Sequence, residues 1–500
     1  MKLLAAATLA ALVLVGAASG EPPRLIVGVT EDGLRFEPAA VARDARPLGI
    51  GAVRITLGWR PGRNRLTPEQ RRELTRATSV EGLRVVLSVF GERAVYAPTT
   101  RAARAQYCDF ARSVLAGFPR IGDIVVWNEP NKTFFWQPQF DAAGRSAAPA
   151  AYAALLARCW DVLHAQRDDV NMLGFSTAPR GNDDPDARSN ISHSPVRFIE
   201  RVGAAYRRSG RSRPLFDTVA HHVHGADPAE RPWRRHPGRS VSQGDYARLV
   251  AALQRAFAGT DQAAPGRCAA GRCVPIWYLE AGFQTRPDGA KARLYTGAEL
   301  PGLGVPDATG PVDLDPLPSE RSPAPDQASQ LVGALRLAAC QPHVEAFFNF
   351  LLWDEARLEG WQSGLYWADR TPKASTAAFR ETVADVEAGR VGCGKVRRQL
   401  PAPAETLGVP AATPAPTAPT TSAPIATPTS AATTTEPTTT EPTTEPSRPA
   451  ETRSGGQTRA EDRGSAEDRR LVFLAAAVAL ALLAAAGLLR RRRGRRGISR

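Results

Sequence analysis

Three patterns that would assign this chain to a common ligand class are missing. No glycine-rich turn directly follows a strand, as it does where an open doubly wound sheet binds a nucleotide phosphate. The formal net charge is +14, yet no basic stripe with interleaved aromatics is present, so nucleic acid is not an expected partner. The cysteines form neither close pairs nor clusters with histidine, as zinc ligands do. No metal or other cofactor is therefore expected.

The N-terminal residues 1–20 have the layout of a secretory signal peptide. A charged Lys2 precedes an apolar run over 3–15, and small residues follow at 18–20. The run is too short to span a membrane. No cysteine follows it directly, so a lipoprotein anchor is not expected.

The C-terminal region predicts an anchor. Residues 471–489 are uncharged and rich in Leu, Ala and Val, which is long enough for a transmembrane helix. Six arginines at 490–496 follow, so residues 490–500 are expected to form a cytoplasmic tail. Residues 399–470 are rich in Pro and Thr and predict a disordered stalk. The chain is therefore expected at the cell surface, with residues 21–398 outside and the membrane and cell wall as neighbours.

The segment 21–398 has globular composition and a regular alternation of elements. Short apolar runs rich in β-formers alternate with helical patterns, which predicts parallel strands closed into a (β/α)8 TIM barrel, an α/β fold. An open doubly wound sheet is the alternative. The expected strands are 25–29, 52–57, 83–89, 123–127, 172–176, 216–222, 274–280 and 344–352. The expected helices are 38–45, one opening at Thr67-Pro68, 100–116, 148–166, 194–208, 242–258, 326–339 and 375–387.

The even number of cysteines favours disulfide bonds in an exported chain. In the barrel, Cys108 and Cys159 lie on neighbouring helices, and Cys340 and Cys393 lie near the ends of the last two helices. Cys268 and Cys273 close a tight loop. The sequence therefore predicts three disulfides with these pairings, and a metal site is the alternative.

Two acidic residues directly follow apolar strands at positions that meet across the barrel mouth. Glu129 ends the fourth strand and Glu280 the seventh. Reactive groups of such barrels stand at the carboxyl ends of strands, and a carboxylate there is costly to bury unless it is paired or used. Retaining glycoside hydrolysis needs two carboxyl groups about 5–5.5 Å apart. For either residue alone, a helix cap or a salt bridge is the alternative.

At these residues the chain resembles the clan A glycoside hydrolases, especially the cellulase-type families 5 and 39, over roughly 26–380. The sequence Trp-Asn-Glu-Pro-Asn at 127–131 is similar to the acid/base motif of the clan. The resemblance implies that Glu129 is the acid/base, Glu280 the nucleophile and Asn128 a contact of the sugar 2-hydroxyl. Leu279 stands where the family carries a small hydroxyl residue.

Further positions match the clan on the second and sixth strands. Arg54 matches an arginine that orders the nucleophile, a task for which a bidentate guanidinium is suited. His222 matches a family histidine, and His224 stands where the family has a tyrosine that donates to the nucleophile. Strand alternation places 222 and 224 on one face and His221 on the other, which argues against a three-histidine metal site.

Several aromatic residues are expected near the substrate. By the resemblance, Trp353 at the end of the eighth strand floors the catalytic sugar subsite, where its ring stacks on sugar C–H groups. Trp59 and Trp136 are candidates for further subsites, with a place in the loop core as the alternative. The long segment 285–326, rich in Pro and Gly, is expected to shape the cleft.

The predicted function is that of a retaining O-glycosyl hydrolase acting on an extracellular oligo- or polysaccharide, through a β-linkage. The departures at Leu279 and His224 keep a second interpretation open, a catalytically inactive carbohydrate-binding protein at the surface. A cell-wall transglycosylase, which would use the same covalent intermediate, is the third.

Overall fold

The barrel is closed and consists only of parallel strands. The computed structural model describes residues 25–269, 271–297, 304–310, 312 and 324–399, all in one compact unit. Strands β1 to β8 pair in sequence order, and β8 closes on β1. Their bounds are Ile26–Thr30, Ala52–Trp59, Arg84–Gly91, Asp123–Val126, Asn171–Thr177, Thr218–His222, Ile276–Ala281 and Val344–Phe350. The predicted (β/α)8 barrel is confirmed and the open sheet is excluded.

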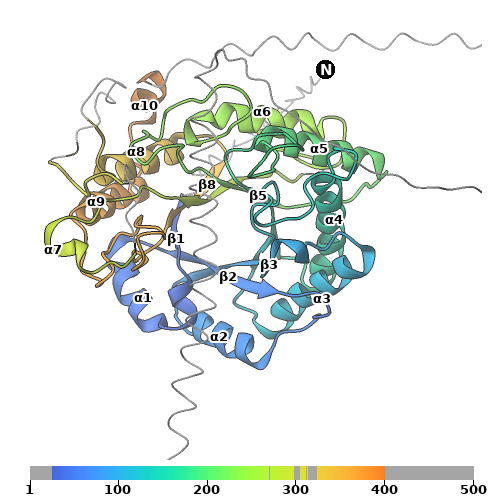
Figure 1. Cartoon of the computed structure of the whole chain (residues 1–500), viewed down its shortest axis with the longest axis horizontal. Helices are drawn as coiled ribbons and strands as arrows, with labels where there is room; N and C mark the ends of the chain where they lie inside the picture. Colours follow the sequence, from blue (N-terminus) through green and yellow to red (C-terminus); the bar gives the residue numbers. More distant parts are fainter. Residues whose placement is uncertain (1–24, 270, 298–303, 311, 313–323, 400–500) are drawn as a thin grey trace, which may run out of the picture. The chain divides into compact units, whose positions relative to one another are not determined.

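Helices surround the barrel in an outer ring (Figure 1). The sequence of α2 shows why one of them begins where it does: Thr67 accepts a hydrogen bond from the Gln70 amide at 3.1 Å, and the Gln70 side chain accepts from the Thr67 amide at 3.0 Å. The helices are α1 (Pro38–Ala45), α2 (Pro68–Thr78), α3 (Arg101–Gly117), α4 (Ala148–Gln166), α5 (Pro195–Arg208), α6 (Tyr246–Phe257), α7 (Gly289–Ala292), α8 (Gln327–Cys340), α9 (Ser375–Glu387) and α10 (Cys393–Gln399).

Strand alternation divides the apolar residues into two cores. One set lies between barrel and helices, and the other fills the barrel itself. On β2, for example, Val53 and Ile55 face the helices, whereas Ala52 faces inward. Arg54, two residues after Ala52, therefore also points into the barrel, above its apolar filling. The barrel core thus forms the floor on which the polar mouth is built.

The three predicted disulfides are confirmed. Cys108–Cys159 joins α3 to α4, Cys340–Cys393 joins α8 to α10, and Cys268–Cys273 closes a short loop. A zinc site formed by these thiols is thereby excluded. The Cys108–Cys159 and Cys340–Cys393 bridges tie neighbouring helices of the outer ring together.

The predictions for the two ends of the chain lie outside the described residues. This applies to the signal peptide (1–20), the linker from 400 to 470, the transmembrane helix (471–489) and the tail (490–500). Among the residues that are described, no helix has the length and apolar character that a membrane span requires.

Candidate active site

The chain after β4 folds into a strained turn that carries Glu129 to the barrel mouth. Trp127 and Glu129 both have positive φ, at 74° and 39°, which costs on the order of 1–3 kcal/mol each for residues other than glycine. The Glu129 amide donates to the Ser176 carbonyl at 2.9 Å and the Trp127 amide to the Val89 carbonyl at 3.0 Å. These bonds, and the full burial of the Trp127 ring, hold the turn.

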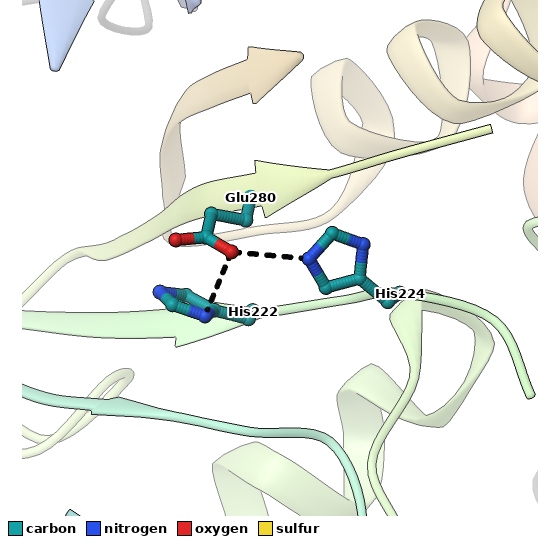
Figure 2. A group of neighbouring side chains, drawn as sticks. All are labelled: His222, His224 and Glu280. Carbon is teal, nitrogen blue, oxygen red and sulfur yellow. Dashed lines mark hydrogen bonds and ion pairs between the residues drawn. The ribbon is translucent and has the colours of Figure 1, made fainter. Parts of the chain in front are cut away.

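Glu280 projects from β7 into a set of donors. Its Oε1 accepts from Arg54 Nη1 at 2.5 Å, and its Oε2 lies 3.2 Å from His224 Nε2 and 3.3 Å from His222 Nδ1 (Figure 2). Burial alone would raise the pKa of Glu280, but His222 and Arg54 and the His224 hydrogen bond together hold this pKa well below its ordinary value. These contacts therefore favour the anionic form of Glu280.

Arg54 divides its guanidinium among three partners. Besides Glu280, Nε donates to Ser88 Oγ at 2.7 Å and Nη2 donates to Asn128 Oδ1 at 2.7 Å. The expected bidentate contact with the nucleophile is therefore wrong, because only one nitrogen reaches it. The Asn128 carbonyl oxygen is used by Arg54, which leaves the Asn128 amide nitrogen to donate toward the cleft.

His222 lies between the two carboxylates. Its Nδ1 is 2.9 Å from Glu129 Oε1 and 3.3 Å from Glu280 Oε2, and its Nε2 is 2.9 Å from Ser176 Oγ. Because both oxygens lie around one nitrogen at 2.9 and 3.3 Å, they cannot be more than about 6.2 Å apart. The predicted convergence of Glu129 and Glu280 is thus present in the structure.

The hydrogen bonds of His224 fix which of its nitrogens carries the proton. The Gly282 amide donates to Nδ1 at 3.2 Å, so the neutral ring bears its hydrogen on Nε2, which donates to Glu280. This is the donor role that was expected of a tyrosine from the resemblance. His221 faces the other way, as alternation predicts, and contacts Thr177 Oγ1 and the Val241 carbonyl.

The same tautomer bears on metal binding. His222, His224 and Glu280 each offer one ligand atom, and these atoms lie within 4.8 Å of one another. A metal at His224 Nε2 would require the hydrogen to move to Nδ1, where it would oppose the Gly282 amide hydrogen. The three residues therefore fit a hydrogen-bonded carboxylate better than a metal ion.

The indole of Trp353 contacts α1 and Arg370. Its Nε1 donates to Asp44 Oδ2 of α1 at 2.9 Å, and the Arg370 guanidinium stands 4.2 Å above its ring centroid. These contacts occupy the indole nitrogen and one ring face, so they do not support the expectation that Trp353 floors the catalytic subsite. Alternation along β8 makes Phe350 the inward residue after Phe348, and Leu351, with φ at 79°, turns the chain outward.

Trp59 and Trp136 belong to the core. Both are fully buried, and neither ring presents a face to the cleft. Trp59 has the outward parity of Val53 on β2, and its Nε1 donates to the Arg63 carbonyl at 2.8 Å. Trp136 packs edge-on against Trp127, with centroids 5.1 Å apart. The loop-core alternative therefore holds for both residues.

The aromatic residue at the site is Trp361, which the sequence did not single out. Its half-buried ring lies 4.8 Å from the His224 ring and 5.0 Å from Phe350, measured between centroids. Ser88 and Ser176, which support Arg54 and His222, were also missed. Inward parity on β3, shared with Val86, was the available signal for Ser88. Ser176 has the outward parity of Met172 and reaches the mouth only through the irregularity at Phe175 and Ser176, and Trp361 lies in a long loop, so neither gave a signal.

Comparisons with known proteins give neighbours of the fold. No protein-family model and no curated protein matches this chain. Similar solved structures include a GH39 β-xylosidase from Caulobacter crescentus, at 16% identity, covering 72% of this chain and 71% of that one with a TM-score of 0.44. Another is GH5_18 from Streptomyces cattleya in complex with GlcNAc, at 18% identity, covering 73% of this chain and 80% of that one with a TM-score of 0.43. A third is the GH39 enzyme from Xanthomonas axonopodis pv. citri, at 15% identity, covering 75% of this chain and 72% of that one with a TM-score of 0.41. At these values the likeness carries no information on the reaction of this chain.

Proposed function

We propose that this protein is a retaining glycoside hydrolase, with Glu280 as nucleophile and Glu129 as acid/base. The observation that carries the proposal is the placement of both carboxylates around His222 Nδ1, with a separation of at most about 6.2 Å between the contacting oxygens. This bound applies to the two oxygens nearest to His222. Retaining enzymes hold their carboxyl groups about 5–5.5 Å apart and inverting enzymes about 6.5–9.5 Å, so a close approach of the two oxygens favours retention.

In the first step a Glu280 oxygen forms a bond to the anomeric carbon while the bond from that carbon to the leaving oxygen breaks. Glu129 gives its proton to the leaving oxygen. The low pKa of Glu280 keeps the attacking group ionised. The Asn128 amide is the proposed donor to the sugar 2-hydroxyl, a bond that strengthens as charge develops at the neighbouring carbon.

In the second step water attacks the same carbon and the ester bond to Glu280 breaks. Glu129, now a carboxylate, accepts the proton of the water, so the enzyme returns to its starting protonation state. Arg54 and His224 hold the departing Glu280 carboxylate through its negative charge. Two inversions at one carbon give net retention.

The substrate we propose is a β-linked oligo- or polysaccharide outside the cell. The aromatic group formed by Trp361 and Phe350 supports a sugar ligand, because ring faces stack on sugar C–H groups. Both rings pack on His224, which donates to Glu280. The leader and the C-terminal apolar run support a place on the outer face of the membrane.

The proposal is tested with the ectodomain, residues 21–400, on a panel of aryl β-glycosides. Hydrolysis is expected, with anomeric retention in the first product seen by NMR. Glu280→Gln should lower kcat beyond ~10⁴-fold, and Glu129→Gln by about 10²–10⁴-fold. The loss in Glu129→Gln should shrink as the leaving phenol becomes more acidic, because such a group departs without a proton.

The outcomes separate the alternative functions. Binding of oligosaccharides without turnover of any glycoside would favour the inactive carbohydrate-binding protein. Products longer than the substrate, formed in place of free sugar because a saccharide replaces water as the acceptor, would favour the transglycosylase. First products of inverted configuration would overturn the retaining mechanism.

A further inference from the structure

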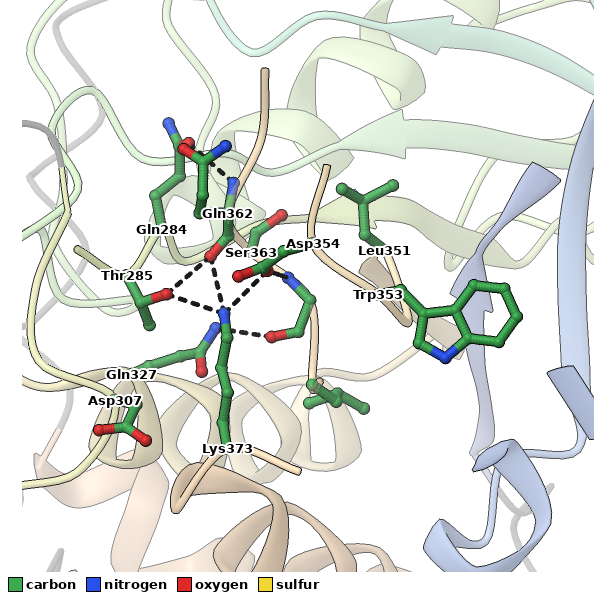
Figure 3. Close-up of polar contacts among 12 residues, drawn as sticks. Gln284, Thr285, Asp307, Gln327, Leu351, Trp353, Asp354, Gln362, Ser363 and Lys373 are labelled. Atoms are coloured by element: carbon green, nitrogen blue, oxygen red, sulfur yellow. Dashed lines mark hydrogen bonds and ion pairs between the residues drawn. The ribbon is translucent and has the colours of Figure 1, made fainter. Parts of the chain in front are cut away.

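The loop that follows β8 contains a fully buried ion pair. Lys373 Nζ lies 2.8 Å from Asp354 Oδ1, and both side chains are 0% exposed. The ammonium also donates to Thr285 Oγ1 at 2.8 Å and to the Gln362 carbonyl at 2.9 Å, so all three of its hydrogens are used (Figure 3). Asp354 accepts further from the Gly364 amide at 2.8 Å and from the Tyr295 hydroxyl at 2.7 Å.

Such a pair adds little to stability by itself. Removing two charges from water costs several kcal/mol per ion, and an apolar pair of similar volume is often about as stable. What the charges add is directional: each hydrogen bond fixes a particular atom of a particular loop. The role of Lys373 and Asp354 therefore depends on which loops their hydrogen bonds hold.

The bonds join the segments after β7 and after β8 at one point, the Gln362 carbonyl. This oxygen accepts from Lys373, from the Thr285 amide at 3.0 Å and from the Thr285 hydroxyl at 2.9 Å. The Gln362 amide donates to Gln284 Oε1 at 3.3 Å. The backbone at 361–362 is thus held by Lys373, which precedes α9, and by Gln284 and Thr285, which follow β7. Because Lys373 is itself bonded to Thr285, these groups cannot move independently.

Trp361 immediately precedes this point. Its amide donates to Glu355 Oε2 at 2.6 Å, and its ring packs on His224, the donor to Glu280. Trp353, which also belongs to this loop, points away from Lys373 and Asp354 (Figure 3). The pair therefore acts on the aromatic residue that lies beside the nucleophile.

We propose that Lys373 and Asp354 are positioning residues that hold Trp361 against His224, so that its ring forms a fixed apolar wall for the sugar bound over Glu280. This deepens the proposed function and rests on it for the identity of the ligand. A wall fixed in advance lowers the ordering cost of binding, so it acts on KM more than on kcat.

The main variant is the double substitution Lys373→Met with Asp354→Leu, which removes both charges and keeps the volume. A matched control is Arg84→Met with Asp123→Leu, because that pair, at 2.6 Å, joins the first residues of β3 and β4 at the opposite end of the barrel. Thr285→Val is a milder second variant that removes one acceptor of Lys373 and one donor to the Gln362 carbonyl without unpairing a charge.

Two measurements are made on each variant. Hydrogen exchange by mass spectrometry should show amides in 355–365 exchanging about 10-fold faster in the Lys373/Asp354 variant, less so in Thr285→Val and unchanged in the control. KM for an aryl β-glycoside should rise ~10-fold in the main variant, with kcat within about 3-fold. If the main variant does not fold, Thr285→Val decides by the same readouts.

A double-mutant cycle tests whether the effect passes through Trp361. Trp361→Ala should raise KM in the wild type, but little further in the Lys373/Asp354 variant. Unchanged exchange over 355–365, or full additivity of the two KM effects, would overturn the proposal. An inactive wild type would contradict the proposed function instead. Hydrogen exchange would then still decide whether Lys373 and Asp354 hold the loop 355–365.

Discussion

Two histidines of this protein each lie between two carboxylates, yet their surroundings differ. His222 contacts Glu129 and Glu280 at the barrel mouth. His236, in the segment between β6 and α6, contacts Asp245 at 2.9 Å and Glu230 at 3.0 Å. The chemical groups are nearly the same, so composition alone does not distinguish a reactive site from a structural one.

The difference lies in how fully the carboxylates are used. Asp245 also accepts from the Ser242 amide and from Arg248, and its side chain is 1% exposed. Glu129 is 15% exposed, and among the described residues only His222 hydrogen-bonds to its carboxylate. The closed cluster around His236 holds a loop, whereas the open cluster around His222 leaves oxygen lone pairs that, under the proposed function, a substrate would use.

Among variants that keep both carboxylates, Arg54→Lys should give the largest effect, because it keeps the charge at the open cluster but removes its geometry. Lysine retains at most one of the contacts with Glu280, Ser88 and Asn128. A misplacement of about 1 Å at a reacting group can cost ~10²-fold, so kcat/KM on an aryl glycoside should fall by about that factor. The matched control is Arg84→Lys, at the opposite end of the barrel, which should change kcat/KM less than about 3-fold. If both variants behaved alike, the open cluster would need only the positive charge at position 54 and not the geometry of the guanidinium.

His224 tests whether the open cluster needs a donor at Glu280. His224→Phe removes the Nε2 hydrogen bond, which to a charged acceptor is worth about 1.5–3 kcal/mol, so kcat/KM should fall roughly 10–100-fold. Losing the donor raises the depressed pKa of Glu280, so the acidic limb of the pH–rate profile should move to higher pH.

His224→Tyr is the companion variant, since its hydroxyl can donate to Glu280 again. It should recover most of the activity lost in His224→Phe, and its acidic limb should lie close to that of the wild type. Equal losses in the two variants, without movement of the acidic limb, would show that His224 acts by packing alone.

The barrel itself could be predicted because its signals are local. Apolar runs of strand length, the capping residues at Thr67 and Pro68, and the helical periods of 148–166 and 375–387 are all written in neighbouring residues. Even the place of Trp59 was available, since its parity on β2 is that of Val53. The pairings of the cysteines followed once neighbouring helices were assigned.

The details of the mouth could not be predicted, because they depend on tertiary context. Leu351 takes a positive φ that turns Trp353 toward α1, and nothing in the local sequence demands it. The division of the Arg54 guanidinium depends on Ser88, which comes from another strand. Lys373 finds its partners across 88 residues at Thr285, a separation that no spacing rule covers.

The smallest effect is expected at the closed cluster, and it concerns stability rather than activity. The hydrogen bonds to Asp245 and Glu230 raise the pKa of His236 to about 9 from its ordinary 6.5. A raised pKa means that the stabilisation is fully present below about pH 6.5 and is lost as pH rises through 9. His236→Gln should therefore lower the free energy of unfolding by on the order of 2 kcal/mol at pH 6 in urea. The difference from wild type should narrow by pH 9.5.

His343→Asn, at an exposed histidine without an ion pair in the described part of the chain, is the control. A gap that stayed constant with pH would mean that His236 contributes through packing, and kcat/KM well below wild type at pH 7 would mean that the two clusters are not separate.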